Sequence, residues 1–261
     1  MDEGQDLGDD MYRLLLEILK PGGDLLIALD TNQNIYRRQS TWKSLGIRAS
    51  GNTHTLKNVY RNTHEIHRFA EAFLGIREAT PPAQRELLPD ATDRHGEPPH
   101  LEHCEDYDAL LDFVEDDIRG RIDRREYARS EIAIIYDDKV YAESDGPLQF
   151  DYAKKEKIRQ IRERLQDAGI PVKWISEDTR AKELYDVTTD RVTLISIHSS
   201  KGLDFDLVYL LGGNQIAPSK TLSNAELDLF YVGITRAKHR LVIPYCWESE
   251  FIVRARKCLK G

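Results

Sequence analysis

Short apolar runs alternate with amphipathic segments along most of the chain, and this alternation constrains the fold more than any other feature. Polar or glycine residues bound the runs, as is typical of buried parallel strands. The residues that we expect to form strands are 24–30, 131–136, 170–175, 192–197, 206–211 and 240–244. Strands that alternate with helices favour a doubly wound, mostly parallel α/β sheet with ligands at the carboxyl ends of its strands.

Apolar stripes at helical spacing lie between these runs. The first follows Asn62 and Glu65, which have the spacing of a capping box at a helix start. The third ends at Gly169, a residue typical of helix ends. Residues from about 80 to 100 are rich in proline and charge and have little periodicity, so we expect a mobile loop there. The stripes consist of Ile66, Phe69, Ala70 and Phe73; of Tyr107, Leu110, Leu111, Val114 and Ile118; of Ile158, Ile161, Leu165 and Ala168; and of Leu227, Phe230, Ile234 and Ala237.

The composition is that of an ordinary globular protein and gives no sign of a membrane segment. Of the 261 residues, 40% are hydrophobic and 31% are charged, and no apolar run is long enough to cross a bilayer. The formal net charge of -8 argues against a general positive field for nucleic acid but leaves room for a local binding groove. The cysteines Cys104, Cys246 and Cys258 lack metal-site spacing and indicate free thiols in a reducing compartment, so we expect a cytoplasmic protein.

Five segments carry residues suited to nucleotide chemistry, although each also has an ordinary structural explanation. Residues 2–6 (DEGQD) place two carboxylates side by side, and such a pair can hold Mg²⁺ and orient an attacking water. An acidic N-terminus is also commonly just solvated. Gln33 follows the first expected strand, where an amide can sense a terminal phosphate, although a polar turn is the simpler interpretation of this segment alone.

The other three segments lie further along the chain. Tyr60 and Arg61 precede the first expected helix, where a ring can stack on a base and a guanidinium can bind a phosphate. Residues 197–205 (IHSSKGLDF) join two expected strands and resemble a phosphate loop, but no G-x-x-x-x-G-K-[ST] occurs, so Lys201 is not the lysine of such a loop. Arg236, on or just before an expected helix, is a candidate arginine finger that neutralises charge on a transferring phosphoryl group. Singly, these residues are as readily explained by packing and salt bridges.

Taken in order, the five segments resemble motifs II, III, IV, V and VI of the UvrD/Rep-like superfamily 1 DNA helicases. The last two motifs are the most specific, and the agreement of all five in order carries the resemblance. The matching stretches are DEGQD at 2–6, DTNQNIYR at 30–37, LKNVYRN at 56–62, TLISIHSSKGLDFDLVYL at 193–210 and FYVGITRAKHRLVI at 230–243.

The resemblance implies a RecA-like fold of the P-loop NTPase type and a motor that couples ATP hydrolysis to movement on single-stranded DNA. It implies that Asp2 binds Mg²⁺, that Glu3 is the catalytic base and that Gln33 contacts the γ-phosphate or the attacking water. The other implied roles are adenine stacking for Tyr60, γ-phosphate contacts for Arg61 and Arg236, a ribose contact for Asp204, and single-stranded DNA contacts for Tyr36, Arg37 and His198.

Departures from the family pattern bear on what the chain does alone. Motif I with its phosphate loop is absent, Arg38 stands where relatives carry a base-stacking tryptophan, and the segment before motif V is too short for the large helical insertion of relatives. We therefore expect residues 1–50 to be a remnant of a first RecA-like domain and residues 51–261 to be a compact second one. The missing N-terminal RecA-like domain of the same protein would be its partner. The chain alone should hydrolyse ATP poorly or not at all.

Two other classes of function remain open. One is a non-catalytic module that binds nucleic acid or protein and has lost the motor; Arg38 favours it, whereas Arg61 and Arg236 count against it. The other is a phosphatase or nuclease built on pairs of acidic residues, which we expect to be solvated and without a metal-ligand constellation. The acidic pairs are Asp116-Asp117 and Asp137-Asp138.

Overall fold

The computed structural model of the chain describes residues 1, 4–20, 22–29, 41–49, 51–54, 60–75, 92–137, 139–140, 149–150, 152–175, 189–211 and 224–260. The chain divides into two compact units, Met1–Lys57 and Asn58–Gly261. The boundary expected at residue 50 lies slightly before this division. The assignment of the first unit to a RecA-like remnant stays a prediction.

An aromatic pair holds the first unit together. Among its described residues, this unit contains a short 3-10 helix, η1 (Gly4–Asp6), and an α-helix, α1 (Asp9–Ile18). Tyr12 on α1 is fully buried, and its hydroxyl donates to the Gly4 carbonyl at 2.5 Å. The ring of Trp42 meets the Tyr12 ring edge-on, with centroids 5.4 Å apart. This contact joins η1, α1 and the turn around Trp42.

The strand expected at residues 24–30 is not formed in its described part. Residues 24–29 have no regular structure, and Leu26 is 82% exposed. This segment pairs with the start of the chain: the Met1 amino group donates to the Leu26 carbonyl, and the Ala28 N–H donates to the Met1 carbonyl, both at 2.8 Å. An apolar run becomes a strand when neighbours pair with it and cover it. Among the described residues of this unit, no strand does so.

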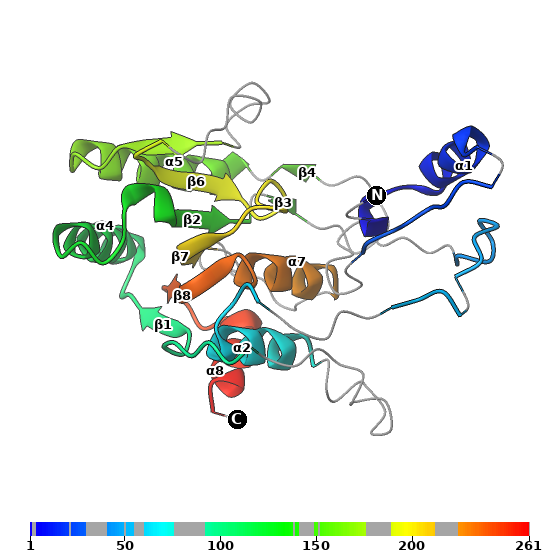
Figure 1. Ribbon diagram of the computed structural model, residues 1–261. Helices are drawn as coiled ribbons and strands as arrows, with labels where there is room; N and C mark the ends of the chain where they lie inside the picture. Colours follow the sequence, from blue (N-terminus) through cyan, green and yellow to red (C-terminus); the bar gives the residue numbers. More distant parts are fainter. Residues whose placement is uncertain are drawn as a thin grey trace. The chain divides into compact units, whose positions relative to one another are not determined.

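The second unit is built on a six-stranded, all-parallel sheet in the order β1-β8-β7-β2-β6-β5 (Figure 1). Ile134 in the central strand pairs with Leu194 on one side and with Tyr209 on the other. The expected α/β fold with a parallel sheet is therefore confirmed. The strands are β1 (His100–His103), β2 (Ile132–Tyr136), β5 (Val172–Trp174), β6 (Val192–Ser196), β7 (Phe205–Leu211) and β8 (Ala237–Tyr245), and a separate antiparallel pair joins β3 (Lys139–Val140) to β4 (Gln149–Phe150).

The strands expected in this unit are all present, and β1 is an addition. β1 contains one hydrophobic residue, Leu101, and lies at the sheet edge with β8 as its neighbour. Such an edge strand has little need of an apolar sequence, which is why the pattern of apolar runs missed it. β1 begins at the end of the loop expected over residues 80–100. The described part of that loop before β1, residues 92–99, has no regular structure.

Helices cover both faces of this sheet (Figure 1). Ile134 and Tyr209 belong to the core that α4 and α5 cover. On the opposite face, a Cβ added to Gly233 of α7 would lie 2.8 Å from Leu210 Cδ1, so a larger residue there would force the Leu210 side chain to move. The helices are α2 (His64–Leu74), α4 (Tyr107–Asp123), α5 (Tyr152–Asp167), α7 (Asn224–Ile234) and α8 (Glu250–Cys258), with a 3-10 turn η4 (Arg129–Glu131).

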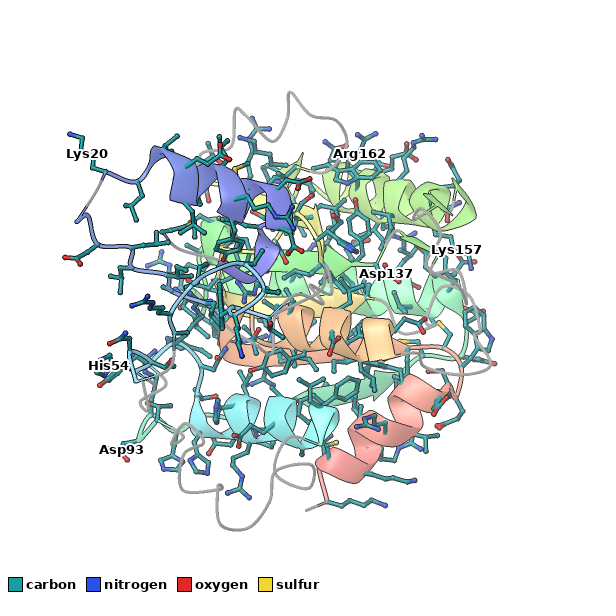
Figure 2. All side chains as sticks on the ribbon, turned by 90° about the vertical axis from the view of Figure 1, so that its right-hand side faces the viewer. Lys20, His54, Asp93, Asp137, Lys157 and Arg162 are labelled. Carbon is teal, nitrogen blue, oxygen red and sulfur yellow. The ribbon has the colours of Figure 1, made fainter. Side chains whose placement is uncertain are left out.

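Phe251 joins the three helices on the α7 face. Its ring centroid lies 4.5 Å from that of Phe230 on α7 and 5.2 Å from that of Phe73 on α2. Figure 2 shows α2, α7 and α8 side by side on this face. Neither Phe251 nor the other two rings is more than 1% exposed, so this cluster is a core of its own. No helix in the described parts of the chain is long and apolar enough to cross a membrane.

Of two helix ends expected from the sequence, one agrees with the structure and the other differs. Gly169 closes α5 as expected, with φ +75° and the next N–H, that of Ile170, bonded to the Leu165 carbonyl at 2.9 Å. The last stripe stops early, because α7 ends at Ile234 and Ala237 is already the first residue of β8. The helix face and the strand that follows it are both apolar, and the pattern alone did not separate them.

Candidate nucleotide-binding site

Three segments that lie far apart in the sequence, 60–63, 203–206 and 235–239, meet where β7 and β8 begin. The Phe205 N–H donates to the Arg236 carbonyl at 2.9 Å and so holds the second segment on the third. These are the segments in which the resemblance predicts motifs IV, V and VI. Their described residues therefore lie at one edge of the sheet, at the amino ends of two adjacent strands.

Asn62 attaches the first segment to the third. Its side-chain nitrogen donates to the carbonyls of Thr235 and Ala237, at 3.0 and 2.6 Å, on either side of the candidate arginine finger. Because this amide is only 4% exposed and fully engaged there, it does not cap α2. Thr63 occupies the N-cap position and makes no side-chain capping hydrogen bond. The capping box expected from Asn62 and Glu65 is thus wrong.

Glu65 instead anchors the segment that leads to β1. Its carboxylate accepts a hydrogen bond from the Gly96 N–H at 2.8 Å and lies 2.9 Å from His95 Nδ1. Desolvation acts to raise the pKa of Glu65, but the hydrogen bonds from His95 and Gly96 outweigh it and lower the pKa below its usual value. The carboxylate therefore stays ionised and holds this segment beside the start of α2.

Arg61 and Asp204 form a half-exposed ion pair at the same edge. Arg61 Nε lies 3.1 Å from Asp204 Oδ2, and the two side chains are 42% and 34% exposed. Lys238 Nζ lies 3.8 Å from the other Asp204 oxygen and 3.0 Å from Asp206 Oδ2. The neighbouring Tyr60 is 72% exposed. An exposed ring that neighbours Arg61 in the sequence suits a base, and two cations near Asp204 suit the polyphosphate of a nucleotide.

Arg236 is fully buried beneath this pair. Its Nε donates to the Val232 carbonyl at 3.0 Å, and its Nη1 donates to the Leu203 carbonyl at 3.0 Å. Nη2 lies 3.3 Å from the hydroxyl of Thr235. The guanidinium thus ties the end of α7 to the residue before Asp204. In this conformation Arg236 supports the site, and a direct phosphate contact would require an exchange of these hydrogen bonds.

The turn between β6 and β7 is closed by its own hydrogen bonds. The Ser200 hydroxyl donates to the Ile197 carbonyl at 2.8 Å, and the Leu203 N–H donates to the Ser200 carbonyl at 3.0 Å. Gly202 has φ +81°, which favours glycine over other residues. A phosphate loop presents such N–H groups to its ligand, and here that of Leu203 is used within the turn. His198 is half-buried in this turn, directly after β6.

The remaining predicted site residues lie outside the described part of the chain. They are Asp2, Glu3, Gln33, Tyr36 and Arg37. Their roles in Mg²⁺ binding, water activation and DNA contact stay predictions. Among the residues that the structure does describe, no three His, Cys, Asp or Glu side chains gather so as to hold a metal ion.

The acidic pairs considered above are not simply solvated. Asp137, labelled in Figure 2, follows β2 and is only 4% exposed. Asp117 accepts hydrogen bonds from the Tyr209 hydroxyl at 2.6 Å and from Arg121 Nε at 3.0 Å. Desolvation raises the pKa of Tyr209, so its hydroxyl is the donor. The expectation of solvated carboxylates is wrong for Asp117 and Asp137, because each of them lies in or beside the packed sheet.

Asn62 and Lys238 are the members of this site that sequence reasoning missed. Asn62 was interpreted as a cap because Glu65 stands at the capping-box spacing, although Thr63 is an equally good N-cap residue. Nothing in a single sequence indicates that its amide reaches carbonyls 173 and 175 residues away. Lys238 directly follows the motif VI stretch T-R-A, and its basic side chain was the one available signal.

Replacing Asn62 by alanine should lower the free energy of unfolding by about 2–3 kcal/mol, because two buried carbonyls lose their donor. Urea denaturation of the two proteins measures the difference. Asn52→Ala is the matched control, since this exposed amide makes one hydrogen bond to the Arg48 carbonyl at 3.3 Å. The control should change stability by no more than about 0.5 kcal/mol. Equal losses in both variants would contradict the attachment role of Asn62.

The second unit is an α/β domain with an all-parallel sheet. Residues 151–248 match the UvrD-like helicase C-terminal domain. Within these residues the chain is therefore similar to the C-terminal domain of UvrD-like helicases. The matched range contains the motif V and motif VI segments and the strands from β5 to β8.

Curated relatives match parts of the chain. The ATP-dependent DNA helicase Rep of Buchnera aphidicola subsp. Acyrthosiphon pisum is 36% identical over 104 residues, which cover 38% of this chain and 15% of that protein. The protein of the same name from Escherichia coli (strain K12) is 36% identical over 67 residues, 23% of this chain and 10% of that protein. The chain thus matches only a small part of the length of these relatives.

A solved structure has the same fold. It is the C-terminal domain of a possible DNA helicase from Lactobacillus plantarum WCFS1. It superposes with a TM-score of 0.52 at 20% identity and covers 77% of this chain and 96% of that chain. At this identity the likeness concerns the fold alone.

Proposed function

We propose that this chain is the C-terminal part of an ATP-dependent DNA helicase or translocase that couples ATP hydrolysis to movement on single-stranded DNA. The observation that carries the proposal is the meeting of residues 60–63, 203–206 and 235–239 at one edge of the sheet, joined by the side chains of Asn62 and Arg236. ATP would bind at this edge, between the second unit and an N-terminal RecA-like domain of the same protein.

Arg61 would act through an exchange of partners. In the structure its guanidinium pairs with Asp204 at 3.1 Å, and both side chains are partly exposed. A γ-phosphate carries more charge than one carboxylate, so it would compete for Arg61 when the cleft closes. Asp204 would then turn to the ribose, while Lys238 remains 3.0 Å from Asp206. Loss of the γ-phosphate on hydrolysis would restore the Arg61–Asp204 pair and open the cleft.

The other residues of the proposed motor have distinct roles. The exposed ring of Tyr60 would stack on adenine, and Arg236 would complete the γ-phosphate contacts after leaving the Leu203 carbonyl. Mg²⁺, held by Asp2, would neutralise phosphate charge during the reaction. Glu3 and Gln33 would deprotonate and orient the attacking water. The single-stranded DNA contacts would come from Tyr36, Arg37 and His198, in a cytoplasmic protein.

A second candidate function is a non-catalytic binding module that has kept the fold. The complete burial of Arg236, with its donors bound to Val232 and Leu203, favours it. An arginine that only holds a turn against a strand has no need of a phosphate. The exposed Tyr60 and Arg61 argue for the motor, because a structural role gives little reason for an exposed ring next to a half-exposed arginine.

Tyr60→Ala should raise the KM for ATP by about 10- to 100-fold, because base stacking on an aromatic ring contributes about 1–3 kcal/mol. The measurement is DNA-stimulated ATP hydrolysis by the parent protein that carries a phosphate loop, while this chain alone should turn over poorly. Trp247→Ala is the matched control: it removes a 38% exposed ring that follows the far end of β8. If the folded parent protein shows no DNA-stimulated ATP hydrolysis, the non-catalytic binding module is the better proposal.

A further inference from the structure

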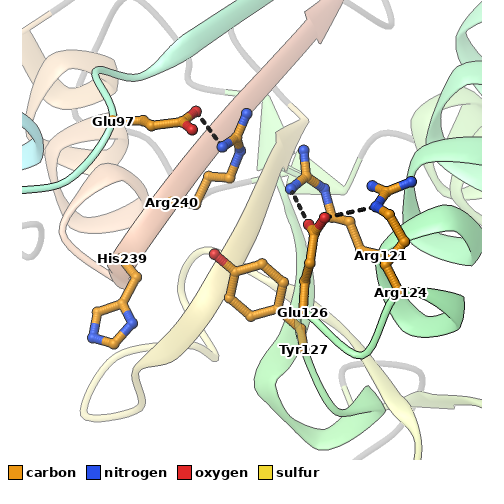
Figure 3. A pocket seen from close by; sticks show the side chains of 7 residues that line it. All are labelled: Glu97, Arg121, Arg124, Glu126, Tyr127, His239 and Arg240. Carbon is orange, nitrogen blue, oxygen red and sulfur yellow. Dashed lines mark hydrogen bonds and ion pairs between the residues drawn. The ribbon is translucent and has the colours of Figure 1, made fainter.

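A pocket of about 600 Å³ opens beside the candidate nucleotide-binding site, at the edge where the strands begin (Figure 3). His239 and Arg240 enter it from the start of β8, and Arg124 enters it from the end of α4. Tyr127 lies between them, on the segment before β2. His239 and Arg240 lie within the motif VI stretch, but the proposed ATP site gives no role to any of these four side chains.

Arg240 offers an unused donor to this pocket. Its Nη1 contacts the carboxylate of Glu97, which is 66% exposed. Its Nε is buried and makes no hydrogen bond within the described structure. A buried guanidinium N–H without an acceptor costs free energy, and an anion that enters the pocket would remove this cost.

Arg121 and Glu126 position the second cation. Arg121 is 10% exposed and binds Asp117 behind the pocket and Glu126 in front of it, at 3.0 and 3.1 Å. Glu126 in turn lies 2.6 Å from Arg124 Nε, and the Arg124 side chain is 58% exposed. Arg121 thus has a structural role. Arg124 uses its Nε for Glu126, and its exposed guanidinium can donate further hydrogen bonds to a ligand in the pocket.

Charge and hydrogen-bond donors both suit an anion. The lining holds three guanidinium groups against two carboxylates, those of Glu97 and Glu126, and both carboxylates are more than a third exposed. Exposed ion pairs of this kind exchange partners at little cost. Desolvation raises the pKa of Tyr127, so its hydroxyl remains a neutral donor at physiological pH. A guanidinium fork matches the oxygens of a phosphate better than it matches any neutral ligand.

We propose that this pocket binds a phosphate group of a nucleotide or a nucleic acid, with Arg240 and Arg124 as the binding cations and Tyr127 as a hydroxyl donor. The incoming phosphate displaces Glu97 from Arg240 and satisfies the Arg240 Nε. The site is distinct from the proposed ATP site, because none of Tyr60, Arg61, Asp204 and Arg236 lines the pocket.

A row of ion pairs joins the two sites. His239 Nδ1 lies 3.5 Å from Asp206 Oδ1, and Lys238 links Asp206 to Asp204 at 3.0 and 3.8 Å. Asp204 is the partner of Arg61. A phosphate beside His239 therefore adds negative charge at one end of a continuous row of polar contacts that ends at Arg61.

The test is binding by the purified chain, with no need for ATP hydrolysis. Inorganic phosphate and pyrophosphate are titrated while the arginine Nε–H resonances are followed by NMR, and a fluorescent oligothymidylate is titrated by anisotropy. Arg240→Gln should weaken binding of the occupying probe roughly tenfold, the loss expected for one charge-assisted contact. Glu97→Gln should tighten it several-fold, because it removes the competing carboxylate. Arg159→Gln, an exposed arginine paired with Glu156 on α5, should leave it unchanged.

The different probes distinguish a small phosphate ligand from the phosphates of a nucleic acid. If Arg240→Gln weakens and Glu97→Gln tightens the binding of phosphate or pyrophosphate, the pocket binds a small phosphate ligand. If the two variants change the binding of oligothymidylate in this way, the pocket binds nucleic acid. Either result supports the proposal. Thermal melts confirm that each variant is folded. The proposal is overturned if Arg240→Gln and Glu97→Gln shift binding in the same direction, or if neither variant differs from Arg159→Gln with any probe.

Discussion

Replacing Arg236 by alanine should lower the free energy of unfolding by about 3–5 kcal/mol, the largest loss that we expect from any single change in this site. The side chain is fully buried, and its removal leaves a cavity and takes one hydrogen bond from each of the Leu203 and Val232 carbonyls, although the Val232 carbonyl keeps that from the Thr235 hydroxyl at 3.1 Å. Urea denaturation followed by tryptophan fluorescence measures the loss. Arg236→Lys should lose less, because an ammonium can keep one of the hydrogen bonds.

The control for Arg236 is Arg159→Ala, which removes an arginine that is 43% exposed and paired with Glu156. Its effect should stay within about 0.5 kcal/mol. An Arg236→Ala protein as stable as the control would contradict the buried arrangement. The expected loss of stability also affects how ATP hydrolysis by this variant is interpreted. A loss of ATP hydrolysis in Arg236→Ala by itself does not identify an arginine finger, because the site beneath Asp204 is lost as well.

Arg61→Ala should reduce the DNA-stimulated kcat of the parent protein at least about a thousandfold while leaving its fold intact. A cation that reaches the γ-phosphate stabilises charge that develops in the transition state, so its loss falls on kcat. The Arg61–Asp204 pair is half-exposed, and removing it should cost no more than about 1 kcal/mol of stability. Steady-state ATP hydrolysis and urea denaturation of the same preparation provide both readouts.

Two comparisons make the Arg61 result decisive. Arg159→Ala removes an equally exposed arginine and should leave kcat unchanged. Arg61→Lys keeps the charge but not the planar fork, and it should recover only part of the rate. A folded Arg61→Ala protein with an undiminished kcat would remove Arg61 from the catalytic site and would strengthen the case for a binding module.

The central strands of the fold could be predicted because their sequences have only one stable environment. Runs such as 132–136 and 192–196 are buried at every position, and only the interior of a parallel sheet accommodates such a run. The apolar run at 24–29 has the same character, but none of the strands in the described residues pairs with it, and its Leu26 remains exposed. The charged strand His100–His103 forms only because β8 provides an edge. In both cases, the presence or absence of a neighbouring strand decided whether the segment formed a strand.

The candidate site was predictable in its residue types and not in its contacts. The order of motif-like segments pointed to Arg61, Asp204 and Arg236, and the structure brings their segments together at one edge. The same reasoning placed Asn62 in a helix cap, whereas its amide joins two carbonyls of a distant segment. The burial of Arg236 was also invisible, since an arginine in a loop is ordinarily exposed.

By itself the sequence determined the parallel α/β unit and the similarity of residues 151–248 to the UvrD-like helicase C-terminal domain, because apolar periodicity and motif order can be recognised without the tertiary structure. Tertiary structure alone decided which polar side chains face a ligand and which support the fold. That choice depends on desolvation and on hydrogen-bond partners that lie far away in the chain. Arg61 and Arg236 carry the same side chain, yet one is half-exposed beside Asp204 and the other is buried among carbonyls.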